Sequence, residues 1–124
     1  MTITQSGETK DLIDPLKLAL SKGIFCFNII NKVESTIAKM TKCGMFVNAG
    51  REHSVASTKA FVGQVVALCL MAVWFSERKN PSLKVVERME LVNSIKFLQM
   101  RVMQTLKEAP DQCKKVAEDL YKHN

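Results

Sequence analysis

The stretch IFCFNII, residues 24–30, decides the fold, because it is an almost unbroken apolar run between Gly23 and Asn31. A short apolar run bounded by turn-forming residues is typical of a strand buried on both faces, as the strands of parallel sheets are. We therefore predict a strand over 24–30 inside a parallel sheet.

Helix and strand patterns alternate on both sides of this run. Residues 11–22 have leucines at helical spacing, and Gly23 provides a stop signal. Pro15 either fits the first turn of this helix, with Asp14 as its cap, or kinks the helix. Residues 1–3 form at most a short strand at the start of the chain.

After the central run, Ser35 and Thr36 can cap a short helix that extends to Lys42, and residues 43–47 have the pattern of another short strand. The resulting order, β-α-β-α-β, favours a parallel sheet with helices packed on it.

The second half of the sequence is helical throughout. We predict a helix from Ser57 to Lys79 whose apolar middle, 60–75, is shorter than the roughly 20 apolar residues that a bilayer requires. We therefore expect a core helix and no membrane contact. Residues 83–108 are predicted to form a long amphipathic helix, which Pro110 ends, and residues 111–122 a last one.

Composition limits the classes of function. A chain of 124 residues with 47% hydrophobic content fits one domain, 1–124. The net charge is +6, but basic and acidic residues are interleaved, which favours a solvated helical surface over nucleic-acid binding. The four cysteines are widely separated and the two histidines far apart, so we expect reduced thiols, a cytoplasmic protein, no metal site and no cofactor.

Two loops rich in hydroxyl groups each come after a predicted strand and open a helix. They are TQSGET, residues 4–9, and EHSVAST, residues 52–58. Free N–H groups at helix starts, together with hydroxyls and a glycine, can hold an anion. The sequence has no GxxxxGK[ST] motif, so a phosphomonoester fits better than a nucleoside triphosphate. The alternative is that these residues are ordinary helix caps.

The strings TQSGET and NAGREHSVASTKAF, residues 48–61, closely resemble the sugar isomerase (SIS) domain. Within that superfamily they are most similar to the isomerase part of the glutamine–fructose-6-phosphate transaminase family, whose pattern is SQSGET followed by NAGxE(I/L)GVASTKA. The resemblance implies an α/β chain with a partial SIS fold. That fold is a three-layer core of about three short parallel strands, followed by long C-terminal helices.

The resemblance also implies a binding site for a sugar phosphate such as fructose 6-phosphate, glucose 6-phosphate or glucosamine 6-phosphate. The implied phosphate contacts are Thr4, Gln5, Ser6, Thr9 and Ser57, and the residues implied beside the sugar are Val55 and Ala56. Thr4 keeps the hydroxyl of the family's serine. The sequence departs more from the family pattern at Arg51, His53 and Ser54, which the resemblance places on the sugar side.

The family has parts that find no counterpart in residues 1–124. An earlier strand, ending in a CGTS-like loop, normally precedes the SQSGET strand, so we expect this chain to be the back two-thirds of a first SIS domain. The family's nucleophilic cysteine is replaced by Thr2, and its isomerase residues belong to a second SIS domain and a C-terminal tail. We therefore assign no catalytic residue, and we expect a homo-oligomer or association with the missing SIS or glutaminase part.

Three hypotheses about function follow. The first is the phosphosugar-binding portion of an isomerising transaminase in amino-sugar (hexosamine) synthesis. The second is a stand-alone regulatory module that binds a sugar phosphate without catalysis. The third, a basic helical nucleic-acid binder, requires one basic face, whereas these helices alternate in charge sign. The neighbouring coding sequence would separate the first two.

Overall fold

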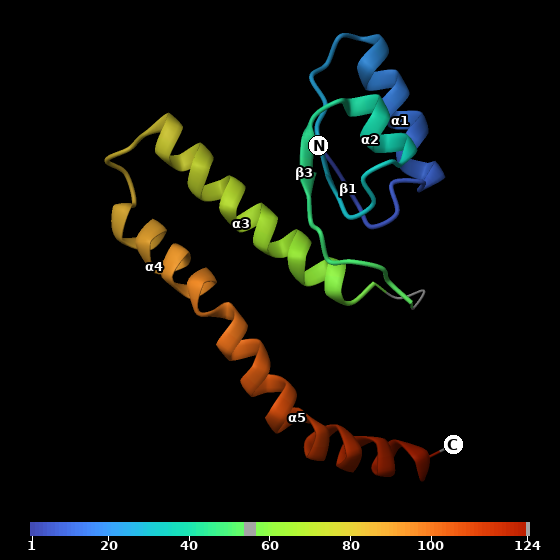
Figure 1. Ribbon diagram of the computed structural model, residues 1–124, viewed down its shortest axis with the longest axis vertical. Helices are drawn as coiled ribbons and strands as arrows, with labels where there is room; N and C mark the ends of the chain where they lie inside the picture. The colour runs from blue at the N-terminus through green and yellow to red at the C-terminus, as the bar shows by residue number, and fades with distance from the viewer. Residues whose placement is uncertain (54–56, 124) are drawn as a thin grey trace. The chain divides into compact units, whose positions relative to one another are not determined.

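The computed structural model describes residues 1–53 and 57–123, and the chain divides into two compact units, Met1–Arg78 and Lys79–Asn124. The first unit contains the predicted β-α-β-α-β order and then a helix (Figure 1). Its elements are β1 (Thr2–Thr4), α1 (Lys10–Ser21), β2 (Asn28–Ile30), α2 (Thr36–Thr41), β3 (Gly44–Phe46) and α3 (Lys59–Lys79).

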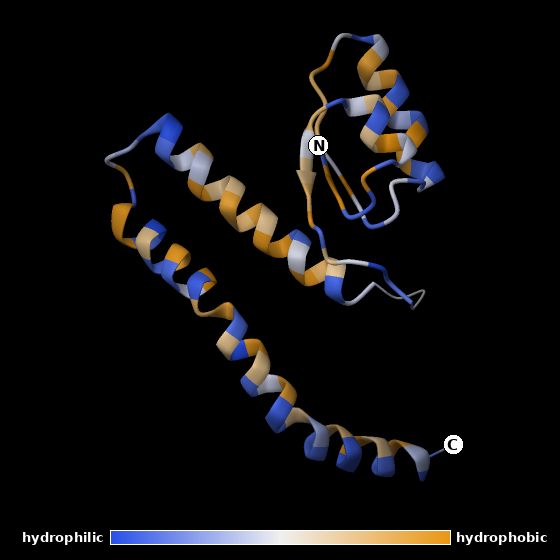
Figure 2. Cartoon of the chain, in the orientation of Figure 1, coloured by the Kyte–Doolittle hydropathy of each residue, from blue (hydrophilic) through white to orange (hydrophobic). Residues whose placement is uncertain are grey.

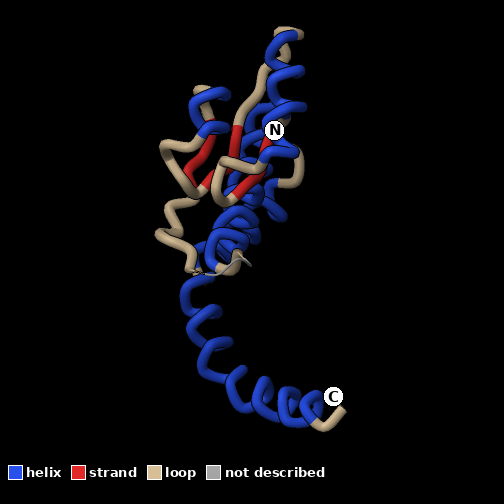
Figure 3. The backbone as a smooth tube through the Cα atoms, turned by 90° about the vertical axis from the view of Figure 1, so that its right-hand side faces the viewer, coloured by secondary structure: helices blue, strands red, loops and turns tan. Residues whose placement is uncertain are grey.

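The three strands form a parallel sheet in the order β1-β2-β3, which confirms the predicted α/β class. The strands lie close together in the tube view (Figure 3). Ile29 in the middle of β2 pairs with Ile3 on one side and Met45 on the other. The central strand covers only 28–30, and not 24–30 as predicted. Both neighbouring strands also have only three residues, so residues 24–27 of the apolar run have no strand residues beside them to pair with. Phe25 is exposed.

One face of the sheet is covered by α1 and α2. Leu16 of α1 and Ile37 of α2 are buried against Cys26 and Ile30, which lie on the same face because side chains alternate along an extended chain. Asn28 shares this face and donates a hydrogen bond to the Thr41 hydroxyl. This is the hydrophobic core of the unit.

The helix α1 begins earlier than its proline suggested. Thr9 is the N-cap, and its carbonyl accepts the N–H groups of Leu12 and Ile13. The prediction of Asp14 as a cap and of Pro15 in the first turn is therefore wrong, because a complete turn already precedes them. At the other end, Gly23 has a φ of +72°, so the predicted glycine stop is confirmed.

The helix α2 agrees with its prediction. The Ser35 hydroxyl accepts the Ala38 N–H at 3.4 Å, and the helix ends at Lys42, which adopts a left-handed conformation.

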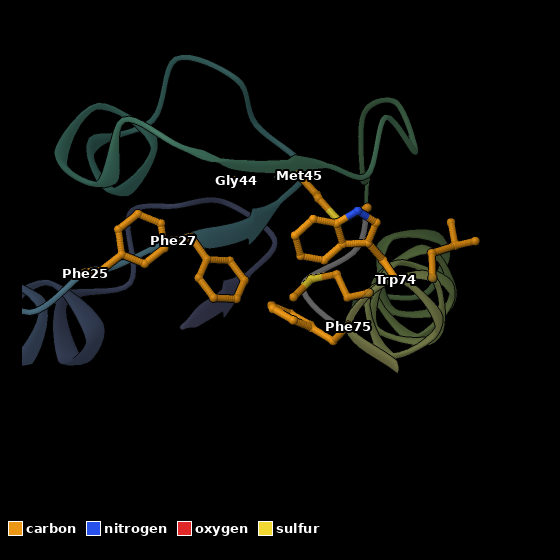
Figure 4. A pocket seen from close by; sticks show the side chains of 8 residues that line it. Phe25, Phe27, Gly44, Met45, Trp74 and Phe75 are labelled. Carbon is orange, nitrogen blue, oxygen red and sulfur yellow. The ribbon is translucent and has the colours of Figure 1, made fainter. Parts of the chain in front are cut away.

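The other face of the sheet is turned toward α3. Met45 and Ile29 share this face because they are paired in the ladder, and Gly63 of α3 lies against Val47. A cavity of about 580 Å³ opens here between apolar side chains of the sheet and the helix (Figure 4). It is lined by Phe25, Phe27, Gly44, Met45, Leu70, Met71, Trp74 and Phe75.

Most of α3 is not buried within the described chain, in contrast to the predicted core helix. Only Ala60, Ala67 and Val73 are buried, whereas several large apolar side chains of α3 are exposed. Figure 2 shows that the helix is hydrophobic along most of its length. By length and composition alone this 21-residue helix could cross a membrane. A single helix of this kind is weak evidence for a membrane span.

The second unit contains α4 (Val85–Lys96) and α5 (Leu98–Tyr121), neither of which has a buried residue. Two predictions are wrong here. The first helical segment breaks at Phe97, and α5 continues through Pro110. Pro110 removes the backbone hydrogen bond to the carbonyl of Leu106, and its ring crowds that carbonyl. On an exposed helix, water can bond the carbonyl.

Candidate functional site

The first loop follows β1 and folds back on its own hydroxyl groups. The Thr4 and Thr9 hydroxyls are 2.9 Å apart, and the Gly7 N–H donates to the Thr4 hydroxyl at 3.3 Å. The Ser6 hydroxyl accepts the Glu8 N–H at 3.2 Å. The sequence-predicted residues Thr4, Ser6 and Thr9 are thus gathered in one turn at the carboxyl end of β1.

Glu8, to which the sequence assigned no role, ties this loop to α2. Its two carboxylate oxygens accept the N–H of Thr36 at 3.0 Å and the Thr36 hydroxyl at 2.6 Å. These hydrogen bonds hold the pKa of Glu8 below its ordinary value of 4.5. The Gly7 carbonyl adds a third bond, from the Ile37 N–H at 3.0 Å. The loop is therefore anchored to the first turn of α2 by three hydrogen bonds.

The second loop, residues 47–58, joins β3 to α3 and so begins before the 52–58 stretch identified in the sequence. Ser57 is exposed and lies two residues before the helix begins at Lys59. Val55 and Ala56, which the resemblance placed beside the sugar, lie outside the described residues.

The start of α3 is held by a carboxylate. Glu52 accepts the Ala60 N–H at 2.9 Å, and this bond is the main cause of a lowered pKa for Glu52. The Lys59 ammonium donates to the Arg51 carbonyl at 2.9 Å. Arg51 and Glu52 are thereby bonded to the first turn of α3.

The two loops leave the same edge of the sheet, because β1 and β3 are parallel to the strand between them. Asn31, directly after β2, contacts both. Its N–H donates to the Gln5 carbonyl at 3.3 Å, and its side chain bonds Ala49 and Gly50 at 2.8 Å each. Sequence reasoning missed Asn31, although a polar residue at the end of a buried strand is a signal for this edge.

Such an arrangement can hold an anion. Hydroxyl groups from one loop stand beside the N-terminal N–H groups of α1, where the helix dipole favours negative charge. Within residues 1–53 and 57–123 there is no group of three or more His, Cys, Asp or Glu side chains placed to hold a metal ion.

The family model for the SIS domain matches residues 1–74, which include both loops and all three strands. The chain belongs to the SIS domain family. This assignment also covers α3 as far as Trp74.

Relatives of this SIS chain carry the name glutamine–fructose-6-phosphate aminotransferase (isomerizing). The Saccharomyces cerevisiae protein is 37% identical over 108 residues, 87% of this chain and 15% of the relative. The Arabidopsis thaliana protein is 37% identical over 105 residues, 85% of this chain and 15% of the relative. The Chlorobaculum tepidum protein is 46% identical over 82 residues, 66% of this chain and 13% of the relative. This SIS chain therefore spans about 15% of the length of these relatives.

Proposed function

We propose that the chain is a sugar-phosphate-binding part of an isomerising glutamine–fructose-6-phosphate aminotransferase in amino-sugar synthesis. The observation that carries this proposal is the Thr4–Thr9 loop, which gathers hydroxyl groups at the carboxyl edge of a parallel sheet in a SIS chain. A soluble, cytoplasmic location belongs to the same proposal.

The phosphate is held by the first loop and the start of α1. The Thr9 hydroxyl bonds Thr4 and makes no cap bond to its own helix, so it leaves the first N–H groups of α1 available to a ligand. Hydrogen bonds from hydroxyl and N–H donors to a phosphate dianion are charge-assisted, at roughly 1.5–3 kcal/mol each before entropy losses.

The sugar lies toward the second loop. Gln5 from the first loop and Ser57 from the second complete the phosphate contacts, and Val55 and Ala56 stand beside the sugar ring. No residue of this chain is assigned to catalysis. Its part in the reaction is to hold and orient the phosphosugar.

Hydrogen exchange of backbone amides tests the proposal. Fructose 6-phosphate or glucose 6-phosphate should raise the protection of amides at 5–9 and 55–58, because both loops close on the ligand. Unphosphorylated fructose and glucose serve as matched controls and should leave these amides unchanged. Equal protection by phosphorylated and plain sugars would mean that the loops are helix caps and no more.

Two serine variants, one in the first loop and one on α4, provide a matched comparison. Ser6→Ala removes one hydrogen bond to a dianion and should weaken the response about tenfold or more. Ser94→Ala, at an exposed position on α4 in the other unit, should leave it unchanged. A full response from Ser6→Ala would remove the first loop from the site.

A further inference from the structure

Asn31 bonds to both loops of the candidate site. Its backbone N–H donates to the Gln5 carbonyl in the first loop, and its side chain bonds two consecutive residues of the second loop. The Oδ1 atom accepts the Ala49 N–H at 2.8 Å, and the Nδ2 atom donates to the Gly50 carbonyl at 2.8 Å.

Asparagine suits this position for a chemical reason. Its planar amide offers one acceptor and one donor side by side, which match the N–H of one residue and the C=O of the next. The two partners also fix the orientation of the amide, because the flipped amide would place oxygen against oxygen and nitrogen against nitrogen. Aspartate would lose the donor, and alanine would lose both groups.

The segment that Asn31 holds has an uncommon backbone conformation. Asn48 and Gly50 both have positive φ angles, 54° and 73°, on either side of Ala49. Asparagine and glycine adopt this conformation at the least cost, and hydrogen bonds from the surroundings help to hold the turn. The side chain of Asn31 supplies two of the bonds that do so.

From this turn the tethering continues to the start of α3. The Arg51 carbonyl accepts the Lys59 ammonium, and the Glu52 carboxylate accepts the Ala60 N–H. The segment between these anchors contains Ser57, one of the proposed phosphate contacts. The hydrogen bonds of Asn31 thus determine where the second loop lies relative to the first.

We propose that Asn31 is a positioning residue. It fixes where the second loop lies relative to the first, so that one ligand can contact both loops. It acts through the backbone of Ala49 and Gly50 and does not itself contact the ligand. The proposal deepens the proposed function, and its ligand-dependent part rests on that function.

The first arm of the test uses the full chain without ligand. Asn31→Ala should raise the exchange rate of the Ala49 amide about tenfold or more, because the acceptor of its hydrogen bond is lost. Asn31→Asp keeps that acceptor and should give a smaller rise, so the proposal stays testable if the alanine variant is poorly folded. Asn93→Ala, at an exposed position on α4, is the matched control and should give none. An unchanged Ala49 amide in Asn31→Ala would overturn the proposal.

The second arm adds fructose 6-phosphate. In the wild type, protection should rise at 5–9 and 55–58 together. In Asn31→Ala, protection should still rise at 5–9, but the rise at 55–58 should be lost, because the second loop is no longer held in position relative to the first. A merely stabilising residue would weaken both responses equally, and that result would overturn the positioning role. If the wild type shows no response at all, the proposed function fails, and the ligand-free arm still decides whether Asn31 holds the second loop.

Discussion

Replacing Gly7 by alanine should destabilise the first unit far more than the same change at Gly23. Both glycines have nearly the same backbone conformation, with φ angles of +68° and +72°. A Cβ atom at Gly23 would meet nothing within 4 Å. At Gly7 it would overlap the Ser35 hydroxyl and the Cδ1 atom of Ile30, and both of these residues are fully buried.

The two substitutions therefore share one cost and differ in another. Alanine in a left-handed conformation costs about 1 kcal/mol relative to glycine, and this applies to both. Overpacking against buried side chains adds typically 1–3 kcal/mol, and this applies to Gly7 alone. We expect a loss of about 3 kcal/mol for Gly7→Ala and about 1 kcal/mol for Gly23→Ala.

Native-state hydrogen exchange of the β2 amides measures the difference, and it does not require the chain to be monomeric. Their exchange should be about 150-fold faster in Gly7→Ala and about fivefold faster in Gly23→Ala, since 1.4 kcal/mol corresponds to a factor of ten. Complete loss of protection in Gly7→Ala with protection retained in Gly23→Ala would also agree. Equal increases in the two variants would refute the reasoning, because Gly7 would then be needed only for its backbone angle.

Three further predictions concern pH, association and activity. Hydrogen bonds from Thr36 lower the pKa of Glu8, so the protection that Glu8 gives to the Thr36 amide should be constant above about pH 4.5 and be lost as the pH falls below that value. In Glu8→Gln this protection should not depend on pH. Protection that is independent of pH in the wild type would contradict the prediction. The purified chain should form dimers or aggregates, because the free edge of β1 and the apolar side of α3 are exposed; a sharp monomeric peak in light scattering together with a cooperative thermal transition would argue against it. The 124-residue chain alone should form no glucosamine 6-phosphate and hydrolyse no glutamine, and turnover above a heat-killed control would contradict the absence of catalytic residues.

The order of elements in the first unit could be predicted because its signals are local. Gly23 ends α1 through its own backbone conformation, and Ser35 caps α2 with a bond to a residue three positions away. Interactions over so few positions can be predicted from neighbouring residues in the sequence. The extent of β2 could not be predicted, because it is set by the length of the strands beside it.

The helices of the second unit show the limit of a proline signal. Pro110 predicts a helix end, because an internal proline removes one backbone hydrogen bond and its ring crowds the carbonyl four residues earlier, but intact turns on both sides can outweigh this cost. No comparable letter marks Phe97, where the structure does break.

The candidate site divides in the same way. The hydroxyl groups of Thr4, Ser6 and Thr9 could be found because their spacing within one loop is visible in the sequence. The bonds of Glu8 to Thr36 and of Asn31 to Gly50 join residues 28 and 19 positions apart. Such pairings depend on the sheet that brings the loops to one edge, so only the folded chain shows them.

The half-exposed apolar residues of α3 that line the cavity show what hydropathy can and cannot decide about association. Leu70, Trp74 and Phe75 retain between 42% and 52% of their exposure, so covering them completely would gain about half the roughly 1.5–3 kcal/mol of a fully buried side chain, or about 1 kcal/mol each. A symmetric dimer covers these side chains on both chains, so the gain is about 6 kcal/mol, which lies in the lower part of the 4–15 kcal/mol estimated for the lost freedom of two associating chains. These three side chains alone therefore give weak contacts. A discrete dimer needs further surface, such as backbone pairing at the free edge of β1, and without that pairing the apolar side of α3 favours heterogeneous aggregates.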